Sequence, residues 1–92
     1  MYEILPYSKK QAKILGVKIA PSIHAGKKID VFNKKGEFIC SIGGIGYYDY
    51  PTFKKLFGKK YAEDRRRLYK ARHEKTRHIK NSASYYADNI LW

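Results

Sequence analysis

Ten lysines and arginines fall within 22 residues, KKYAEDRRRLYKARHEKTRHIK at positions 59–80, and only three acids accompany them. Guanidinium and ammonium groups bind phosphates, and the counterions that they displace drive association with a polyanion. The composition favours one long helix from Lys59 to about Ile79. The expected nucleic-acid-binding residues are Lys59, Lys60, Arg65, Arg66, Arg67, Lys70, Arg72, His73, Lys75, Arg77 and Lys80.

Two arginines interrupt an otherwise apolar stripe of this expected helix. At helical spacing the stripe carries Tyr61, Arg65, Leu68, Tyr69, Arg72 and Ile79. We expect its apolar members to be buried, and a buried arginine then needs a carboxylate partner such as Asp49, Asp64 or Asp88. The other side of the helix is expected to be exposed and carries Arg66, Arg67, Lys70, His73 and Arg77.

The excess of positive charge extends over the whole chain. Twenty Lys and Arg residues stand against eight Asp and Glu residues, which gives a net charge of +12. Such a field attracts polyanions but does not specify a fold. With 92 residues, 43% of them apolar, residues 1–92 are expected to form a single basic domain rather than a disordered tail.

Cysteine content and hydropathy indicate the compartment. The single cysteine, Cys40, excludes a disulfide within the chain and fits a reducing environment. No apolar run approaches the ~20 residues of a membrane-spanning helix. The start, MYEILPYSKK, lacks the features of a signal peptide. We therefore expect an intracellular protein that is neither secreted nor membrane-bound.

Residues 43–50, GGIGYYDY, combine glycines with tyrosines. Backbone amides of such a segment can approach a phosphate, and exposed tyrosine rings can stack on bases. The candidates for stacking or backbone contact are Tyr47, Tyr48 and Tyr50. The segment is superficially similar to the GIY-YIG nuclease signature, but that signature consists of two separated tripeptides and a later metal-binding glutamate. A tight turn that leads into a helix is the favoured interpretation.

The histidines and acids argue against metal and catalytic chemistry. His73 and His78 are five residues apart, which is a poor spacing for one metal ion on one helix face, and His24 is remote. The eight acids form no cluster with histidine that suits a two-metal nuclease. We expect no catalytic residue, no metal site and no cofactor, and hence a protein that is not an enzyme.

A β-hairpin is the clearest signal of regular structure. Two runs alternate in hydrophobicity, and a turn that contains Gly36 joins them. In the second run, Phe38, Cys40 and Ile42 are expected to share one face. The expected strands are residues 17–20, 28–33 and 38–42.

Capping residues predict the helices. Ser8 and Gly16 are expected to cap a helix over residues 9–15, while Asp49 or Tyr50 begins a second helix that Gly58 ends. The apolar residues 84–92 are predicted to form a short helix that packs on the hairpin, and a dimer contact is the alternative. The expected fold class is therefore α+β, with a small antiparallel sheet packed by short helices and one long basic helix.

Four segments carry a resemblance to a viral family: KKIDVF, SIGGIGYYDYPTF, YAEDRRRLYKARHEK and YYADNILW. They resemble a family of small, basic, uncharacterised proteins of nucleocytoplasmic large DNA viruses, the giant viruses, over roughly residues 12–92. The resemblance implies a protein of the virion, or of the nucleus or cytoplasm of an infected cell. It implies no catalytic residues.

The favoured hypothesis is a non-enzymatic DNA-binding protein whose contacts are mainly to phosphates and weakly specific. Double-stranded DNA is the expected ligand, RNA is a further one, and genome packaging, condensation or gene regulation would use such binding. One alternative is a virion structural or adaptor protein that binds acidic proteins or RNA. Another is a small nuclease or nuclease accessory that depends on Tyr47, Arg72 or His73.

Overall fold

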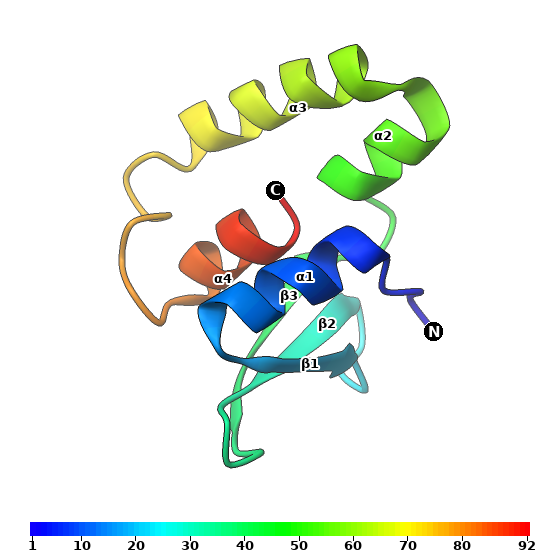
Figure 1. Ribbon diagram of the computed structural model, residues 1–92. Helices are drawn as coiled ribbons and strands as arrows, with labels where there is room; N and C mark the ends of the chain where they lie inside the picture. The colour runs from blue at the N-terminus through cyan, green and yellow to red at the C-terminus, as the bar shows by residue number, and fades with distance from the viewer.

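The computed structural model describes all 92 residues as four helices and a three-stranded antiparallel sheet (Figure 1). This confirms the predicted α+β class. The elements in chain order are α1 (Pro6–Leu15), β1 (Lys18–Pro21), β2 (Lys27–Phe32), β3 (Phe38–Gly44), α2 (Tyr50–Phe57), α3 (Lys59–Arg72) and α4 (Ala83–Ile90).

The sheet has the order β1-β2-β3 and contains the predicted hairpin. Ile29 pairs with Ile42, but the register shifts between Val31 and Phe32, so that Phe32 stands opposite Phe38. The Phe38 ring lies 5.1 Å from the ring of His24, on the opposite face of the sheet from Ile42. The expectation that Phe38 shares the face of Ile42 is therefore wrong, because the bulge shifts the alternation by one residue.

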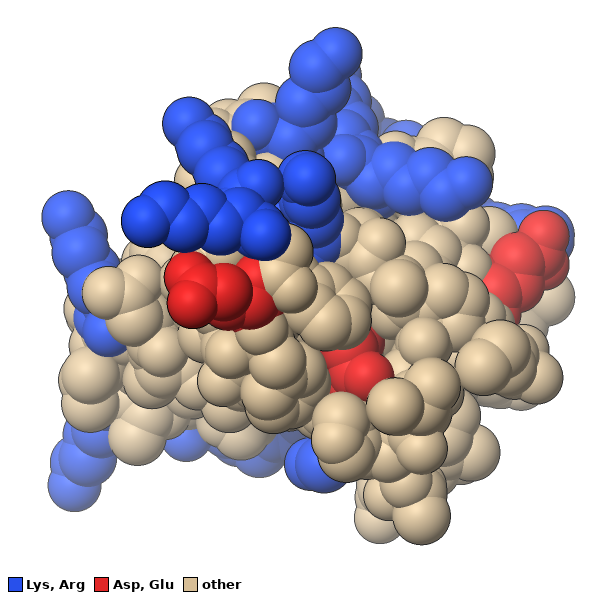
Figure 2. All heavy atoms as spheres, turned by 90° about the horizontal axis from the view of Figure 1, so that it is seen from below, with Lys and Arg blue, Asp and Glu red and all other residues tan.

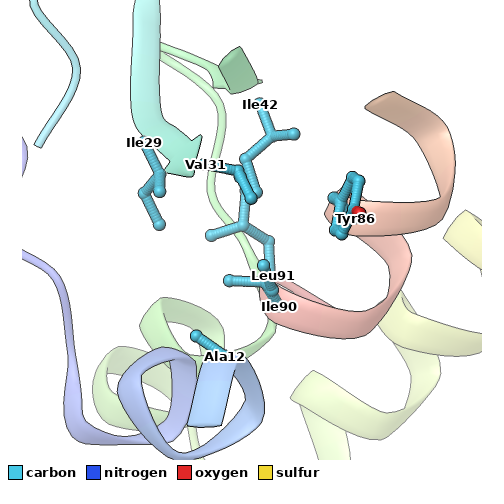
Figure 3. Packing of buried hydrophobic residues seen from close by; sticks show 7 residues of the cluster. All are labelled: Ala12, Ile29, Val31, Ile42, Tyr86, Ile90 and Leu91. Carbon is cyan, nitrogen blue, oxygen red and sulfur yellow. The ribbon is translucent and has the colours of Figure 1, made fainter. Parts of the chain in front are cut away.

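One face of the sheet is covered by α1 and α4, which lie side by side (Figure 1). Figure 3 shows the side chains that meet there, drawn from both helices, the segment after α4 and the strands β2 and β3. The buried cluster consists of Ala12, Ile29, Val31, Ile42, Tyr86, Ile90 and Leu91. The prediction that the last residues pack on the hairpin is confirmed, since Tyr86, Ile90 and Leu91 belong to this cluster. The burial of their apolar side chains drives this packing.

The first helix begins three residues earlier than predicted. Pro6 occupies its first turn, where the missing amide donor costs nothing, so the helix starts there and not after Ser8. Ser8 is instead buried, and its hydroxyl donates a hydrogen bond to the carbonyl oxygen of Ile90 over 2.9 Å. Gly16 ends the helix as predicted, in the left-handed conformation with φ of 76°.

The second and third helices are joined by the single residue Gly58. Asp49 caps α2 as predicted, since its carboxylate accepts a hydrogen bond from the amide of Thr52 over 3.0 Å. In Figure 1, α3 runs across the end of the molecule beyond α4, and α2 meets it at an angle.

The basic helix is shorter than predicted. It ends at Arg72, and residues 73–82 form a series of turns that return the chain to α4. Side-chain contacts hold these turns: Thr76 bonds to Ser84 over 2.8 Å, and Arg77 reaches Asp88 over 3.5 Å. The residues Lys75, Arg77 and Lys80 therefore belong to a loop and not to the helix.

Candidate nucleic-acid interface

The buried charges make the surface more basic than the composition alone indicates. Three of the eight acids, Asp30, Asp49 and Asp88, are buried, whereas Lys28 is the only buried base. On the face drawn in Figure 2, long Lys and Arg side chains crowd the upper edge and others appear at the left and lower edges, while acidic groups show only as isolated patches. The exposed surface therefore attracts anions over a wide area.

Two of the expected phosphate-binding residues are turned inward. Lys70 lies 2.8 Å from the Asp88 carboxylate, and Arg77 lies 3.5 Å from it, with 30% and 21% of their side chains exposed. Arg77 also pairs with Glu74 over 2.7 Å. The expectation that Lys70 and Arg77 lie on an exposed side of the helix is wrong, because the buried Asp88 carboxylate requires cationic partners.

Arg66 is also engaged within the protein. Its guanidinium lies 3.7 Å from the centre of the Tyr50 ring and 3.7 Å from the carboxylate of Glu63. Tyr50 is buried and donates its hydroxyl hydrogen to Glu63 over 2.7 Å, so the expectation that its ring is exposed for stacking is wrong. Burial, reinforced by Glu63, raises the pKa of Tyr50.

The remaining candidate residues of the segment have at most a loose ion pair within the protein. Arg67 is exposed and has only a loose pair with Asp64, at 3.7 Å. His73 is half-buried and stacks on the ring of Tyr69, with centroids 4.2 Å apart. No carboxylate pairs with the others, which are Lys59, Lys60, Arg65, Arg72, Lys75 and Lys80.

A cleft of about 600 Å³ lies between α3 and the loop that follows β3. The helix contributes Arg65, Tyr69 and Arg72, which lie on or beside the stripe whose apolar members are expected from the sequence to be buried. The expected burial of the apolar stripe residues is wrong, because Tyr61 and Leu68 are exposed. The buried residue of α3 is Ala62, which is not part of the stripe. Sequence periodicity cannot distinguish a core-facing stripe from one that faces a cleft.

The floor of the cleft is electrically neutral. Lys28 donates a hydrogen bond to Asp49 over 2.9 Å, and the hydroxyl of Tyr2 donates to the same carboxylate oxygen over 2.6 Å. Burial, together with the hydrogen bond to Asp49, raises the pKa of Tyr2, so this tyrosine remains a donor. The cations that the cleft can offer to a ligand are therefore Arg65 and Arg72.

The walls of the cleft are aromatic. The rings of Tyr69 and Trp92 stack with centroids 4.3 Å apart and an interplanar angle of 8°. On the opposite wall, Tyr47 is 78% exposed, and Tyr48 packs edge-on against Phe53 with a centroid separation of 5.4 Å. The predicted exposure of Tyr47 and Tyr48 is thus confirmed, and both rings line the cleft.

Glycine 43 explains how the loop after β3 lies so close to the core. Its φ of 76° is a left-handed conformation, and a Cβ atom there would lie 2.8 Å from Leu91 Cδ1. The turn interpretation of this segment therefore has a steric basis. Gly44 makes room for the Tyr47 ring in the wall of the cleft, since a Cβ atom at position 44 would come within 3.1 Å of that ring.

A polar cluster on the other face of the sheet was not predicted. The Asp30 carboxylate accepts hydrogen bonds from Ser22 and Ser41, each over 2.6 Å, and lies 3.0 Å from Nδ1 of His24. Burial raises the pKa of Asp30, but these hydrogen bonds outweigh it and hold the pKa well below its usual range.

This cluster does not have the geometry of a catalytic triad. Ser41 and Asp30 both contact Nδ1 of His24, whereas a relay needs the nucleophile and the acid on opposite ring nitrogens. The hairpin register places Ser41 opposite Asp30, and the alternation of the two strands is the sequence signal for that pairing. No local signal indicates that the loop with Ser22 and His24 folds back onto Asp30. The cluster fastens that loop to the sheet.

No group of three or more His, Cys, Asp or Glu side chains is arranged to hold a metal ion. None of the helices is long and apolar enough to cross a bilayer. The chain matches no protein-family model, no curated protein and no solved structure. The resemblance to a viral family stays a prediction, and function is inferred from the side chains of this chain alone.

Proposed function

We propose that this protein binds nucleic acid without modifying it, through contacts made mainly to phosphates. The observation that carries the proposal is the set of six cations of residues 59–80 that have no carboxylate partner: Lys59, Lys60, Arg65, Arg72, Lys75 and Lys80. In a protein with only eight acids, three of them buried, these cations are left for an external anion.

The arrangement of α3 supports weak sequence specificity. One side of the helix is fixed to the rest of the protein: Ala62 is buried, Arg66 lies over the ring of Tyr50, and Lys70 pairs with Asp88. A recognition helix that enters the major groove presents several side chains to base edges, whereas the free cations here are spread over α3 and the loop after it. Double-stranded DNA is the first polymer expected, and packaging or condensation of a genome would use such binding.

The test is a fluorescence-anisotropy titration of labelled duplex DNA, single-stranded DNA and double-stranded RNA at several salt concentrations. The variant Lys59→Gln/Lys60→Gln/Lys75→Gln removes three unpaired charges. On duplex DNA, each lost phosphate contact should reduce by about 0.9 the steepness with which the logarithm of the binding constant falls with the logarithm of the salt concentration. A matched control, Lys9→Gln/Lys10→Gln/Lys13→Gln, removes three exposed charges from α1.

Three results would contradict the proposal. An equal loss in both triple variants would show that the segment 59–80 is not the binding surface. Undetectable binding of all three polymers near physiological salt would favour an acidic protein as the partner. Magnesium-dependent cleavage of the labelled strand would instead favour a nuclease.

A further inference from the structure

The cleft between α3 and the loop after β3 combines two guanidinium groups that have no carboxylate partner with aromatic walls, among which the Tyr47 ring is largely exposed. We propose that it holds one nucleotide, a planar base that carries a phosphate, presented by a single-stranded segment or a strand end. The inference rests on the proposed function and names the unit of the polymer that the protein recognises.

The dimensions of the cleft suit one such unit. A volume of about 600 Å³ lies in the range of sites that bind small molecules, roughly 300–1,000 Å³. A base inside a duplex cannot reach the cleft, since both of its faces are covered by neighbouring base pairs. The bound nucleotide must therefore be unstacked, as in a single strand.

The charges of the cleft place the phosphate at its rim. Arg65 and Arg72 lie two helical turns apart, roughly 10 Å along the axis of α3. Neither has a carboxylate partner, and the guanidinium of Arg65 lies 5.4 Å from the centre of the Phe53 ring, which limits its motion. Because Lys28 neutralises Asp49 on the floor, no free carboxylate repels the phosphate.

The aromatic residues provide the surface for the base. Both faces of the Tyr69 ring are covered, one by Trp92 and the other by His73, so this group closes one wall of the cleft. The exposed ring of Tyr47, on the other wall, offers the stacking face. Gly44 lets Tyr47 lie close to the backbone, because any Cβ at that position would displace the ring. A base stacks on such faces with little regard to its identity, which agrees with weak sequence specificity.

The first measurement uses the fluorescence of Trp92, the single tryptophan of the chain and a residue of the cleft. Titration with dAMP should change it saturably, 2′-deoxyadenosine should bind more weakly, and inorganic phosphate should compete with dAMP. An unsaturable change, or equal affinity for dAMP and the nucleoside, would overturn the assignment of base and phosphate to this cleft.

The second measurement compares two double variants on labelled single-stranded and duplex DNA. Arg65→Gln/Arg72→Gln should weaken single-strand binding about tenfold or more, whereas the charge-matched Lys9→Gln/Lys10→Gln should change it only about twofold. Tyr47→Ala should weaken the affinity for single-stranded DNA about fivefold or more. Tyr47→Phe, which keeps the ring, should bind as the wild type does. Far-UV circular dichroism establishes that each variant is folded.

The outcomes separate the two proposals. If the polymers bind but the arginine pair and its control behave alike, and dAMP leaves Trp92 unchanged, the cleft is not a nucleotide site while the proposed function stands. If no polymer binds but dAMP changes Trp92 saturably, the proposed function fails and the cleft is a site for free nucleotides. Equal weakening of single-strand and duplex binding by Arg65→Gln/Arg72→Gln also contradicts the inference.

Discussion

The ammonium group of Lys70 lies 2.8 Å from the buried carboxylate of Asp88, and this ion pair fixes α3 to α4. Arg77 reaches the same carboxylate from the loop that joins the two helices. Because Lys70 is held on the inner side of α3, the neighbouring stripe with Arg65 and Arg72 is turned toward the cleft. An internal ion pair thus determines which cations of the helix are free to bind.

Replacement of Asp88 by asparagine should destabilise the fold without weakening nucleic-acid binding. Asp88→Asn removes the charge that Lys70 and Arg77 share, and we expect a loss of about 1–3 kcal/mol in the free energy of unfolding. The control, Asp64→Asn, breaks only an exposed pair and should cost less than about 1 kcal/mol. Urea denaturation measures both, and equal losses would contradict the anchoring role of Asp88.

Truncation of Ile90 tests the packing of the last helix on the sheet. Ile90 is fully buried, so Ile90→Ala should reduce the free energy of unfolding by about 2–5 kcal/mol. Ile23 is largely exposed, and Ile23→Ala removes the same atoms at a cost of at most about 0.5 kcal/mol. A small effect of the Ile90 change would mean that α4 does not cover the hairpin in solution.

The close approach of the loop to the core predicts a difference between two glycines. Both Gly43 and Gly36 have positive φ, but only Gly43 would place a Cβ against Leu91 and Lys28, at 2.8 and 2.9 Å. Gly43→Ala should therefore cost about 1–3 kcal/mol more than Gly36→Ala, since the latter causes backbone strain without a clash. Thermal unfolding of the two variants gives this comparison, and equal costs would exclude the clash.

The low pKa of Asp30 predicts a loss of stability in acid. Its folded pKa lies below the unfolded value of about 4, so its contribution is present above that value and is lost as the pH falls toward the folded pKa. In Asp30→Asn the free energy of unfolding should therefore change less between pH 5 and pH 2 than in the wild type. Parallel slopes for the two proteins would mean that Asp30 does not contribute to acid unfolding.

The predictions from sequence that hold depend on short-range signals. The presence of the hairpin, the Gly16 end of α1 and the Asp49 cap of α2 are each determined by residues within a few positions of one another. Exposure of Tyr47 and Tyr48 is equally local, because they follow a turn in a glycine-rich loop. Such features do not depend on distant parts of the chain.

The predictions that fail depend on long-range contacts. Residues 73–79 have helix-forming composition, but they form turns in which Arg77 is drawn toward Asp88, eleven residues away. The Asp88 carboxylate also holds Lys70 on the inner side of α3. In the same way, the ring of Tyr50 holds the guanidinium of Arg66. The opening of the cleft beside Arg65 and Arg72 follows from how α2, α3 and α4 pack, which no local pattern specifies.

The hydrogen bond from Ser8 to the carbonyl of Ile90 joins residues 82 positions apart, and Gln11 reaches Asn89 over a similar separation. Both contacts hold α1 against the segment that covers the hairpin. During synthesis, the apolar face of β2 and β3 therefore emerges from the ribosome after α1 but long before α4, the other part of its cover, exists. We expect the nascent chain to stay exposed to chaperones and proteases until Leu91 has left the exit tunnel, with closure of the fold as a late, slow event.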